Sequence, residues 1–132
     1  MSSKNLWGQL PSTDEITTPT QILKEQATQL TDLTKGVLQG DVSVRQSSGK
    51  FLLQLAIQAP FVDNYEYVAL YASHSLDLYP VTVAAGWEDK YHPKTKVDCA
   101  NREEFETTIG GILSSDRIRR VIASLLAQSR AM

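Results

Sequence analysis

The stretch DVSVRQSSGKFLLQLAIQAP, residues 41–60, is typical of a β-hairpin and decides the class of fold. A two-residue turn at Ser48–Gly49 sets Val44 opposite Leu53, so that the apolar faces of the two strands coincide. A four-residue loop at 47–50 gives the same pairing, so the predicted register does not depend on the turn length. Alternation puts four apolar side chains on one face of the second strand: Phe51, Leu53, Leu55 and Ile57.

The next stretch, NYEYVALYASH at residues 64–74, is predicted to be a third strand with two different faces. One face carries aliphatic side chains that suit a position beneath a helix: Val68, Leu70 and Ala72. The other face carries three phenols, which we expect on the open side of the sheet: Tyr65, Tyr67 and Tyr71. Tyrosine is common in strands and enriched at interfaces, so these rings are either decoration of a half-buried face or a contact surface.

A fourth strand is expected over residues 76–84, with a bulge at Tyr79–Pro80 where the apolar parity changes. A loop follows, and then a short edge strand at 96–100 that carries Cys99. These strands follow one another through short connections. Because parallel strands need long crossovers, the predicted sheet is antiparallel.

Along the chain, one helix is expected before the strands and two after them. The first begins at Thr18 as N-cap with Pro19 in the first turn, and glycines at positions 36 and 40 are competing stop signals. Two further helices begin at Asn101 and Ser115. Gly110–Gly111 weakens the first of these, and we expect it to allow close packing against a neighbour.

The chain is therefore predicted to be an α+β protein with one two-layer domain over residues 18–132. Its antiparallel sheet has four or five strands, and the N-terminal helix and two C-terminal helices pack on one face. Residues 1–17 are expected to form an extended or partly ordered arm. Within this arm Trp7 is expected to pack on the surface of its own domain, or else into a neighbouring chain.

Composition favours a globular protein without a strong affinity for polyanions. Of the 132 residues 42% are hydrophobic and 21% charged, and the formal net charge is −2. Neither half of the chain is polybasic, which argues against broad nucleic-acid binding. No apolar run is long enough for a secretory signal or a bilayer span, and a single cysteine favours a reducing compartment, so we expect a cytoplasmic protein.

Catalytic chemistry finds little support in the sequence. His74 and Asp77 could form a general base and its orienting group, with Tyr79 and Tyr91 lining a pocket, but a turn histidine beside a solvated aspartate is the simpler interpretation. His92 precedes a proline in a polar loop and is expected at the surface. One cysteine and two histidines match no zinc spacing, and phosphate-binding loops are absent, so we predict neither a metal nor a cofactor.

A group of arginines opens the last predicted helix: Arg117, Arg119 and Arg120. Cations at a helix N-terminus oppose the helix dipole, so we expect something to offset them. One candidate is ion pairing with the preceding helix, through Glu103, Glu104 and Glu106. The other is an external anion, either a nucleic-acid phosphate or an acidic patch on a partner.

Three functional hypotheses follow. The leading one is a non-enzymatic interaction module, an accessory or adaptor protein, that binds a protein partner or itself through Tyr65, Tyr67 and Tyr71, with a homodimer expected. The second is an enzyme or small-ligand pocket near His74 and Asp77. The third is nucleic-acid binding through the arginine group at 117–120, which the small number of cations makes the least favoured.

Overall fold

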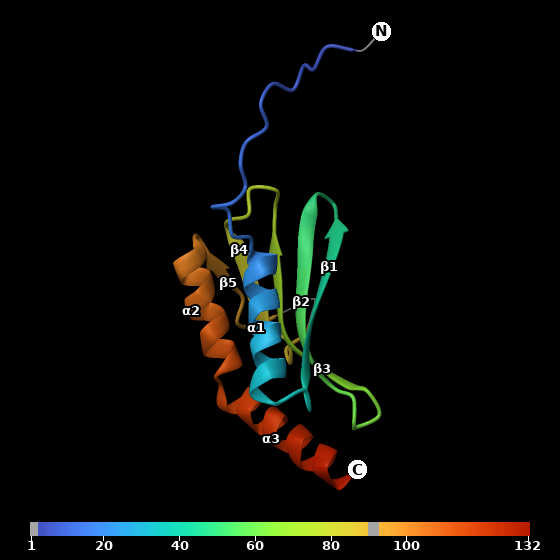
Figure 1. Ribbon diagram of the computed structural model, residues 1–132. Helices are drawn as coiled ribbons and strands as arrows, with labels where there is room; N and C mark the ends of the chain where they lie inside the picture. The colour runs from blue at the N-terminus through green and yellow to red at the C-terminus, as the bar shows by residue number, and fades with distance from the viewer. Residues whose placement is uncertain (1–2, 90–92) are drawn as a thin grey trace.

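The computed structural model describes residues 3–89 and 93–132 and shows an α+β architecture (Figure 1). Its elements, in chain order, are α1 (Pro19–Leu33), β1 (Gln39–Ser47), β2 (Lys50–Ala59), β3 (Tyr65–His74), β4 (Val81–Ala85), β5 (Val97–Cys99), α2 (Arg102–Leu113) and α3 (Asp116–Ala131). The predicted fold class is confirmed, including the order of one helix, then strands, then two helices.

The strands form one antiparallel sheet in the order β1-β2-β3-β4-β5. The predicted hairpin register is confirmed, since Val44 lies opposite Leu53. Ser48 and Gly49 form the two-residue turn, with φ values of 51° and 79°. Positive φ at both turn residues matches the right-handed twist of the strands, and this explains why a glycine stands at position 49.

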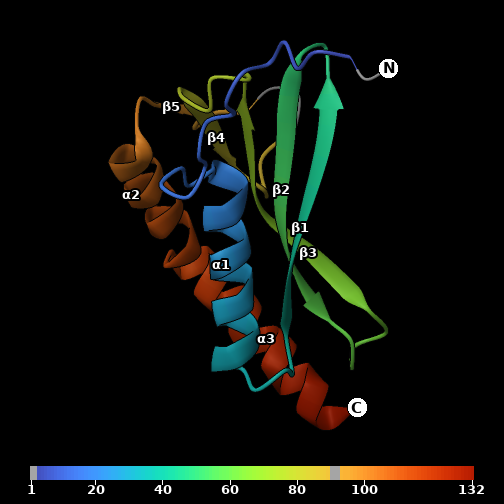
Figure 2. The ribbon, with the colours of Figure 1, turned by 45° about the horizontal axis from the view of Figure 1, so that its top comes forward.

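All three helices of the described chain lie on one face of the sheet (Figures 1 and 2). α1 packs on β1 and β2, whereas α2 packs on β4 and β5. α3 continues from the end of α2 and lies over the part of the sheet where β2 ends and β3 begins. A buried cluster joins α3 to this part of the sheet, and it includes Ile57, Ala59, Ala69, Ile118 and Leu125.

Local capping chemistry sets the helix starts as predicted. Thr18 accepts a hydrogen bond from the Gln21 amide at 3.1 Å, and the Gln21 side chain accepts one from the Thr18 amide at 2.8 Å, which completes a capping box. Asn101 and Ser115 cap α2 and α3 in the same way, each through its side-chain oxygen. α1 ends at Leu33, before either predicted glycine stop.

The structure corrects the predicted start of the fourth strand, the predicted role of the glycine pair in α2 and the predicted packing of Trp7 on its own domain. β4 begins only at Val81, because Leu78 has a φ of 73° and Pro80 has no N–H for a ladder. Nothing lies within 4 Å of a side chain built at Gly110 or Gly111, so these glycines serve no close packing. Trp7 is 85% exposed and the arm runs away from the domain, so the ring does not pack on its own domain (Figure 1).

Candidate docking cleft between β3 and α3

A β-bulge in β3 determines where the tyrosines point. Leu55 of β2 lies opposite Leu70, but the next β2 residue, Ala56, lies opposite Val68. Ala69 is therefore an extra residue in β3, and it is fully buried. An extra residue reverses the facing of every side chain on one side of it relative to the other.

The bulge separates the three tyrosines that were expected on one open face. Tyr67 lies opposite Ile57 and Tyr65 opposite Ala59, so both phenols share the face that the helices cover. Tyr71, beyond the bulge, lies on the open face. The expectation of a single tyrosine face is therefore wrong, because strict alternation does not survive the insertion at position 69.

Gly86 keeps the chain close to β3 at this bulge. Its amide donates to the Ala69 carbonyl at 2.8 Å, and a Cβ at position 86 would clash with the backbone of Val68. Only glycine permits such an approach. The close contact places Trp87, the next residue, against the cluster beneath α3.

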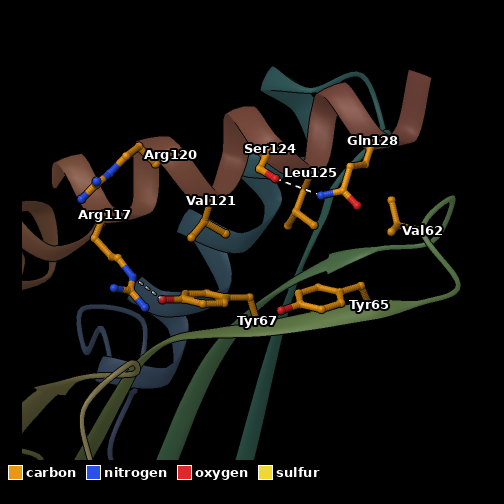
Figure 3. Close-up of a pocket in the computed structure, with 9 residues that line it drawn as sticks. All are labelled: Val62, Tyr65, Tyr67, Arg117, Arg120, Val121, Ser124, Leu125 and Gln128. Atoms are coloured by element: carbon orange, nitrogen blue, oxygen red, sulfur yellow. Dashed lines mark hydrogen bonds between the residues drawn. The ribbon is translucent and has the colours of Figure 1, made fainter. Parts of the chain in front are cut away.

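Tyr65 and Tyr67 form one wall of a cleft of about 450 Å³, and α3 forms the other (Figure 3). We call this the β3–α3 cleft. The helix contributes residues at successive turns: Arg117, Arg120, Val121, Ser124, Leu125 and Gln128. Val62, from the turn before β3, lies at one end. Tyr65 remains 50% exposed, so the cleft opens to solvent along this wall.

Arg117 is held at one end of the cleft by two aromatic side chains. Its Nε donates to the Tyr67 hydroxyl at 3.1 Å, and its guanidinium carbon lies 5.9 Å from the centre of the Trp87 ring. A cation over an indole face is attracted by the ring quadrupole. Within the described residues Arg117 has no ion-pair partner, so its terminal amino groups stay available to an incoming acceptor.

The predicted ion pairs between α2 and the arginine group do not form in the described part of the chain. Glu106 pairs instead with Arg102 on its own helix, at 2.6 Å, and the Glu104 carboxylate accepts from the Ala100 amide. Arg120 lines the β3–α3 cleft with Arg117, while Arg119 is not among its lining residues. Only Arg117 thus reaches the tyrosine wall, because the Arg120 side chain points away from the phenols and its Nε donates to the Asp116 carbonyl at 3.4 Å (Figure 3). The sequence did not predict the contact between Arg117 and Tyr67.

The rest of the cleft is apolar with a polar end. Val121 and Leu125 face the phenols, and Gln128 donates to the Ser124 hydroxyl at 2.9 Å (Figure 3). The helical spacing of Arg117, Val121, Ser124 and Gln128 marks one stripe of α3, which is a signal that the sequence already holds. Which strand residues would face that stripe depends on the bulge.

The alternative pairing of His74 with Asp77 does not form in the described part of the chain. The His74 ring is buried and stacks on Phe51 with centroids 5.3 Å apart, and its Nδ1 lies 2.6 Å from the Ser75 carbonyl oxygen. Asp77 is exposed, and within the described residues no hydrogen bond or ion pair joins it to His74. This is the environment of a core histidine, and it gives the proposed general base no orienting carboxylate.

Neighbouring polar groups add no reactive constellation within the described chain. The Tyr79 hydroxyl is buried and has no hydrogen-bond partner among residues 3–89 and 93–132, and burial raises the pKa of this phenol. Cys99 lies on β5, the predicted edge strand, and is buried there with its sulfur 3.4 Å from the Thr108 hydroxyl oxygen. Tyr91 and His92, which the sequence suggested as pocket and surface residues, lie outside the described residues.

Residues 3–89 and 93–132 offer neither a metal centre nor a membrane-spanning helix. No cluster of three histidine, cysteine or acidic side chains is arranged there to hold a metal ion. Within the same ranges no helix has both the length and the apolar character that a bilayer crossing requires.

Comparison with known proteins adds no assignment: no family, no curated protein and no solved structure matches the chain. Fold and cleft together define a small α+β domain with an arginine- and tyrosine-lined cleft at one end of its sheet.

Proposed function

We propose that this protein is a non-enzymatic interaction module that binds an acidic peptide segment of a partner in the β3–α3 cleft. The observation that carries the proposal is the contact of Arg117 with Tyr67 in one open cleft, with Tyr65 on the same wall and Arg120 at the rim. None of the described residues that line the cleft is acidic, so the two cations have no balancing charge there.

The side chains of the cleft suit a protein partner. Guanidinium groups bind carboxylates through paired hydrogen bonds, and Arg117 is already oriented by Tyr67 and Trp87. Pre-orientation reduces the entropy lost on binding. Tyrosine and arginine are also the residues that dominate binding energy in many protein interfaces.

The dimensions favour an extended segment. From Arg117 to Gln128 the cleft follows three turns of α3, which is about 16 Å at 1.5 Å per residue. An extended peptide covers that length with about five residues. We therefore expect acidic residues at the arginine end and an apolar residue over Val121 and Leu125.

The test is fluorescence anisotropy with short labelled peptides in which two glutamates precede a leucine, compared with the same peptides carrying lysine in place of glutamate. Saturable binding of the acidic set alone is expected. Arg117→Ala should weaken it about tenfold, equivalent to roughly 1.4 kcal/mol. Tyr67→Ala should weaken it by a similar factor, because it removes both a wall of the cleft and the acceptor for Arg117.

Matched controls come from the same elements. Arg119→Ala removes a neighbouring cation that does not line the cleft, and Tyr71→Ala removes a phenol on the opposite face of the sheet. Both should leave the affinity unchanged. Equal losses for Arg117→Ala and Arg119→Ala would show a diffuse charge effect and contradict the proposal.

The same arginines test the nucleic-acid alternative. A labelled single-stranded oligonucleotide should not bind at low salt if the cleft is built for a peptide. Binding that falls steeply with salt and weakens alike for Arg117→Ala, Arg119→Ala and Arg120→Ala would favour the nucleic-acid hypothesis over the proposed function.

A further inference from the structure

β1 is the long free edge of the sheet. It is the first strand of the sheet order, and in both views its part towards the β1–β2 turn forms the outer border, with none of the described helices beyond it (Figures 1 and 2). β5, at the other border, has only three residues. A free edge presents unpaired backbone groups and is a template for another strand.

The hairpin geometry shows which backbone groups of β1 point outward. A two-residue turn closes on a hydrogen-bonded pair, here Ser47 and Lys50, and hydrogen-bonded and non-hydrogen-bonded pairs alternate from there. The backbone groups of Val42 and Val44 therefore face away from β2. Gly40 supports this parity, because its amide donates to the Thr31 hydroxyl at 3.2 Å and so leaves the ladder. That bond also ends the open edge, which runs from residue 41 onward.

We propose that β1 pairs antiparallel with β1 of a second copy of this chain, about a two-fold axis at Ser43. In this register Val42 exchanges backbone hydrogen bonds with Val44 of the second copy. Asp41 then lies opposite Arg45 of the second copy, and the same pair recurs on the other side of the axis. The interface is isologous, as a two-fold axis requires.

Charge selects this register from those that the edge allows. Asp41 and Arg45 are both on the open face of the sheet, and neither has an ion-pair partner in the described part of its own chain. The pair would occupy a non-hydrogen-bonded site, where opposite side chains come closest. Shifting the axis by one residue to Val42 or Val44 pairs Asp41 with Ser43 or with Ser47 instead, and both ion pairs are lost.

Burial of apolar side chains on the helix-covered face of the sheet also favours pairing of two β1 strands in this register. Val44 is 48% exposed in the single chain, whereas Val42 packs against the core. Pairing places each exposed Val44 beside Val42 of the other copy. The edge is therefore complementary to itself in charge and in apolar character, which is the reason for choosing a second copy rather than an unrelated strand.

The experiment is sedimentation of the full chain over a range of micromolar concentrations. The unaltered protein should form a dimer. Asp41→Arg and Arg45→Asp should each dissociate it, with the dimer dissociation constant raised at least tenfold, because like charges then face each other. An equimolar mixture of the two variants should form a heterodimer, since one chain then carries two arginines at these positions and the other two aspartates. Restored association also shows that both variants fold.

A backbone variant tests the hydrogen bonds separately. Val44→Pro removes an amide that faces away from β2, so the hairpin should persist, as judged by circular dichroism, while the dimer is lost. A monomer at every concentration would overturn the proposal. A dimer dissociation constant that neither Asp41→Arg nor Arg45→Asp changes would also overturn it. The same holds if the two variants remain monomeric when they are mixed. None of these results tests peptide binding in the β3–α3 cleft, which is measured separately.

Discussion

At the residue scale, two small side chains control the geometry of the candidate site. Ala69 is the extra residue of the bulge and is fully buried, and Gly86 lies directly against the β3 backbone beside it. Together they turn Tyr65 and Tyr67 toward α3 and bring Trp87 under Arg117. Neither small residue carries chemistry of its own, so their contribution to binding is positional.

Replacing Gly86 with alanine should destabilise the fold by about 1–3 kcal/mol, because the new Cβ meets the rigid backbone of Val68. Gly111→Ala is the matched control, since a Cβ there meets open space inside a helix. It should stabilise by roughly 0.5–1 kcal/mol. Urea denaturation measures both, and a Gly86→Ala protein as stable as the control variant would contradict the close contact.

Tyr67→Phe isolates the hydroxyl that orients Arg117. The ring and its packing remain, so the free energy of unfolding should change by less than about 1.5 kcal/mol. Affinity for the acidic peptide should still fall several-fold, because the guanidinium loses one of its two supports. Denaturation and anisotropy on the same preparation separate the two effects, and unchanged affinity would show that Arg117 needs no orientation.

At the scale of elements, side chains at the ends of helices and loops hold segments in place. Thr18 and Gln21 satisfy each other's amides at the start of α1, which therefore begins at a defined residue. In the loop before β5, the Glu88 carboxylate accepts from the Lys94 amide at 2.8 Å and from the Thr95 amide at 3.0 Å. It also accepts from the Thr95 hydroxyl.

Thr18→Ala should reduce stability by about 1 kcal/mol through loss of the N-cap bond. Thr28→Ala, at an exposed position in the middle of α1, should be neutral or slightly stabilising, because alanine is the better helix former. Thermal melting of the two variants gives the comparison. Equal melting temperatures would mean that the capping box adds nothing to the folded state.

The loop held by Glu88 should loosen in acid. Hydrogen bonds from the Thr95 side chain and backbone lower the pKa of this carboxyl, so the folded state binds its proton less readily than the unfolded state. The stabilisation is therefore present at neutral pH and lost as pH falls through the lowered pKa. An NMR titration of the Thr95 amide should show an inflection at a pH below the ordinary pKa of a glutamate side chain. In Glu88→Gln the inflection should disappear; if it persists, another group is titrating.

At the scale of the whole molecule, the two proposed contact surfaces lie on different elements. The β3–α3 cleft uses the helix-covered end of the sheet, while the dimer edge uses β1 at the border (Figure 2). One surface could thus bind a partner while the other joins two copies. Two clefts in one dimer would raise the avidity for a partner that offers two segments.

This separation predicts independent energetics. Arg117→Ala should leave the dimer dissociation constant unchanged, and Arg45→Asp should leave peptide affinity per chain unchanged, since distant sites without shared partners behave additively. Sedimentation and anisotropy on both variants provide the four measurements. Coupling of more than a few-fold in either direction would show that the surfaces communicate or overlap.

The sequence alone determined the features that depend on residues close together in the chain, namely the hairpin and the starts of the helices. The hairpin at 41–60 follows from alternation and a turn that needs positive φ, and Thr18, Asn101 and Ser115 start helices because each can bond an amide two or three residues on. These interactions are complete within one or two elements, so the pattern of the chain is sufficient to predict them.

Only the tertiary structure decided the site. Whether Ala69 pairs or bulges depends on how β2 and β4 hold β3, and the run Val68-Ala69-Leu70 is apolar throughout, which conceals the change of face. The partners of Arg117 come from β3 and from the segment after β4, far away in the chain. Side chains that tertiary packing brings together leave no periodic pattern in the sequence. The tyrosines and the arginines could therefore each be identified as candidates from the sequence, but the contact between them could not be predicted.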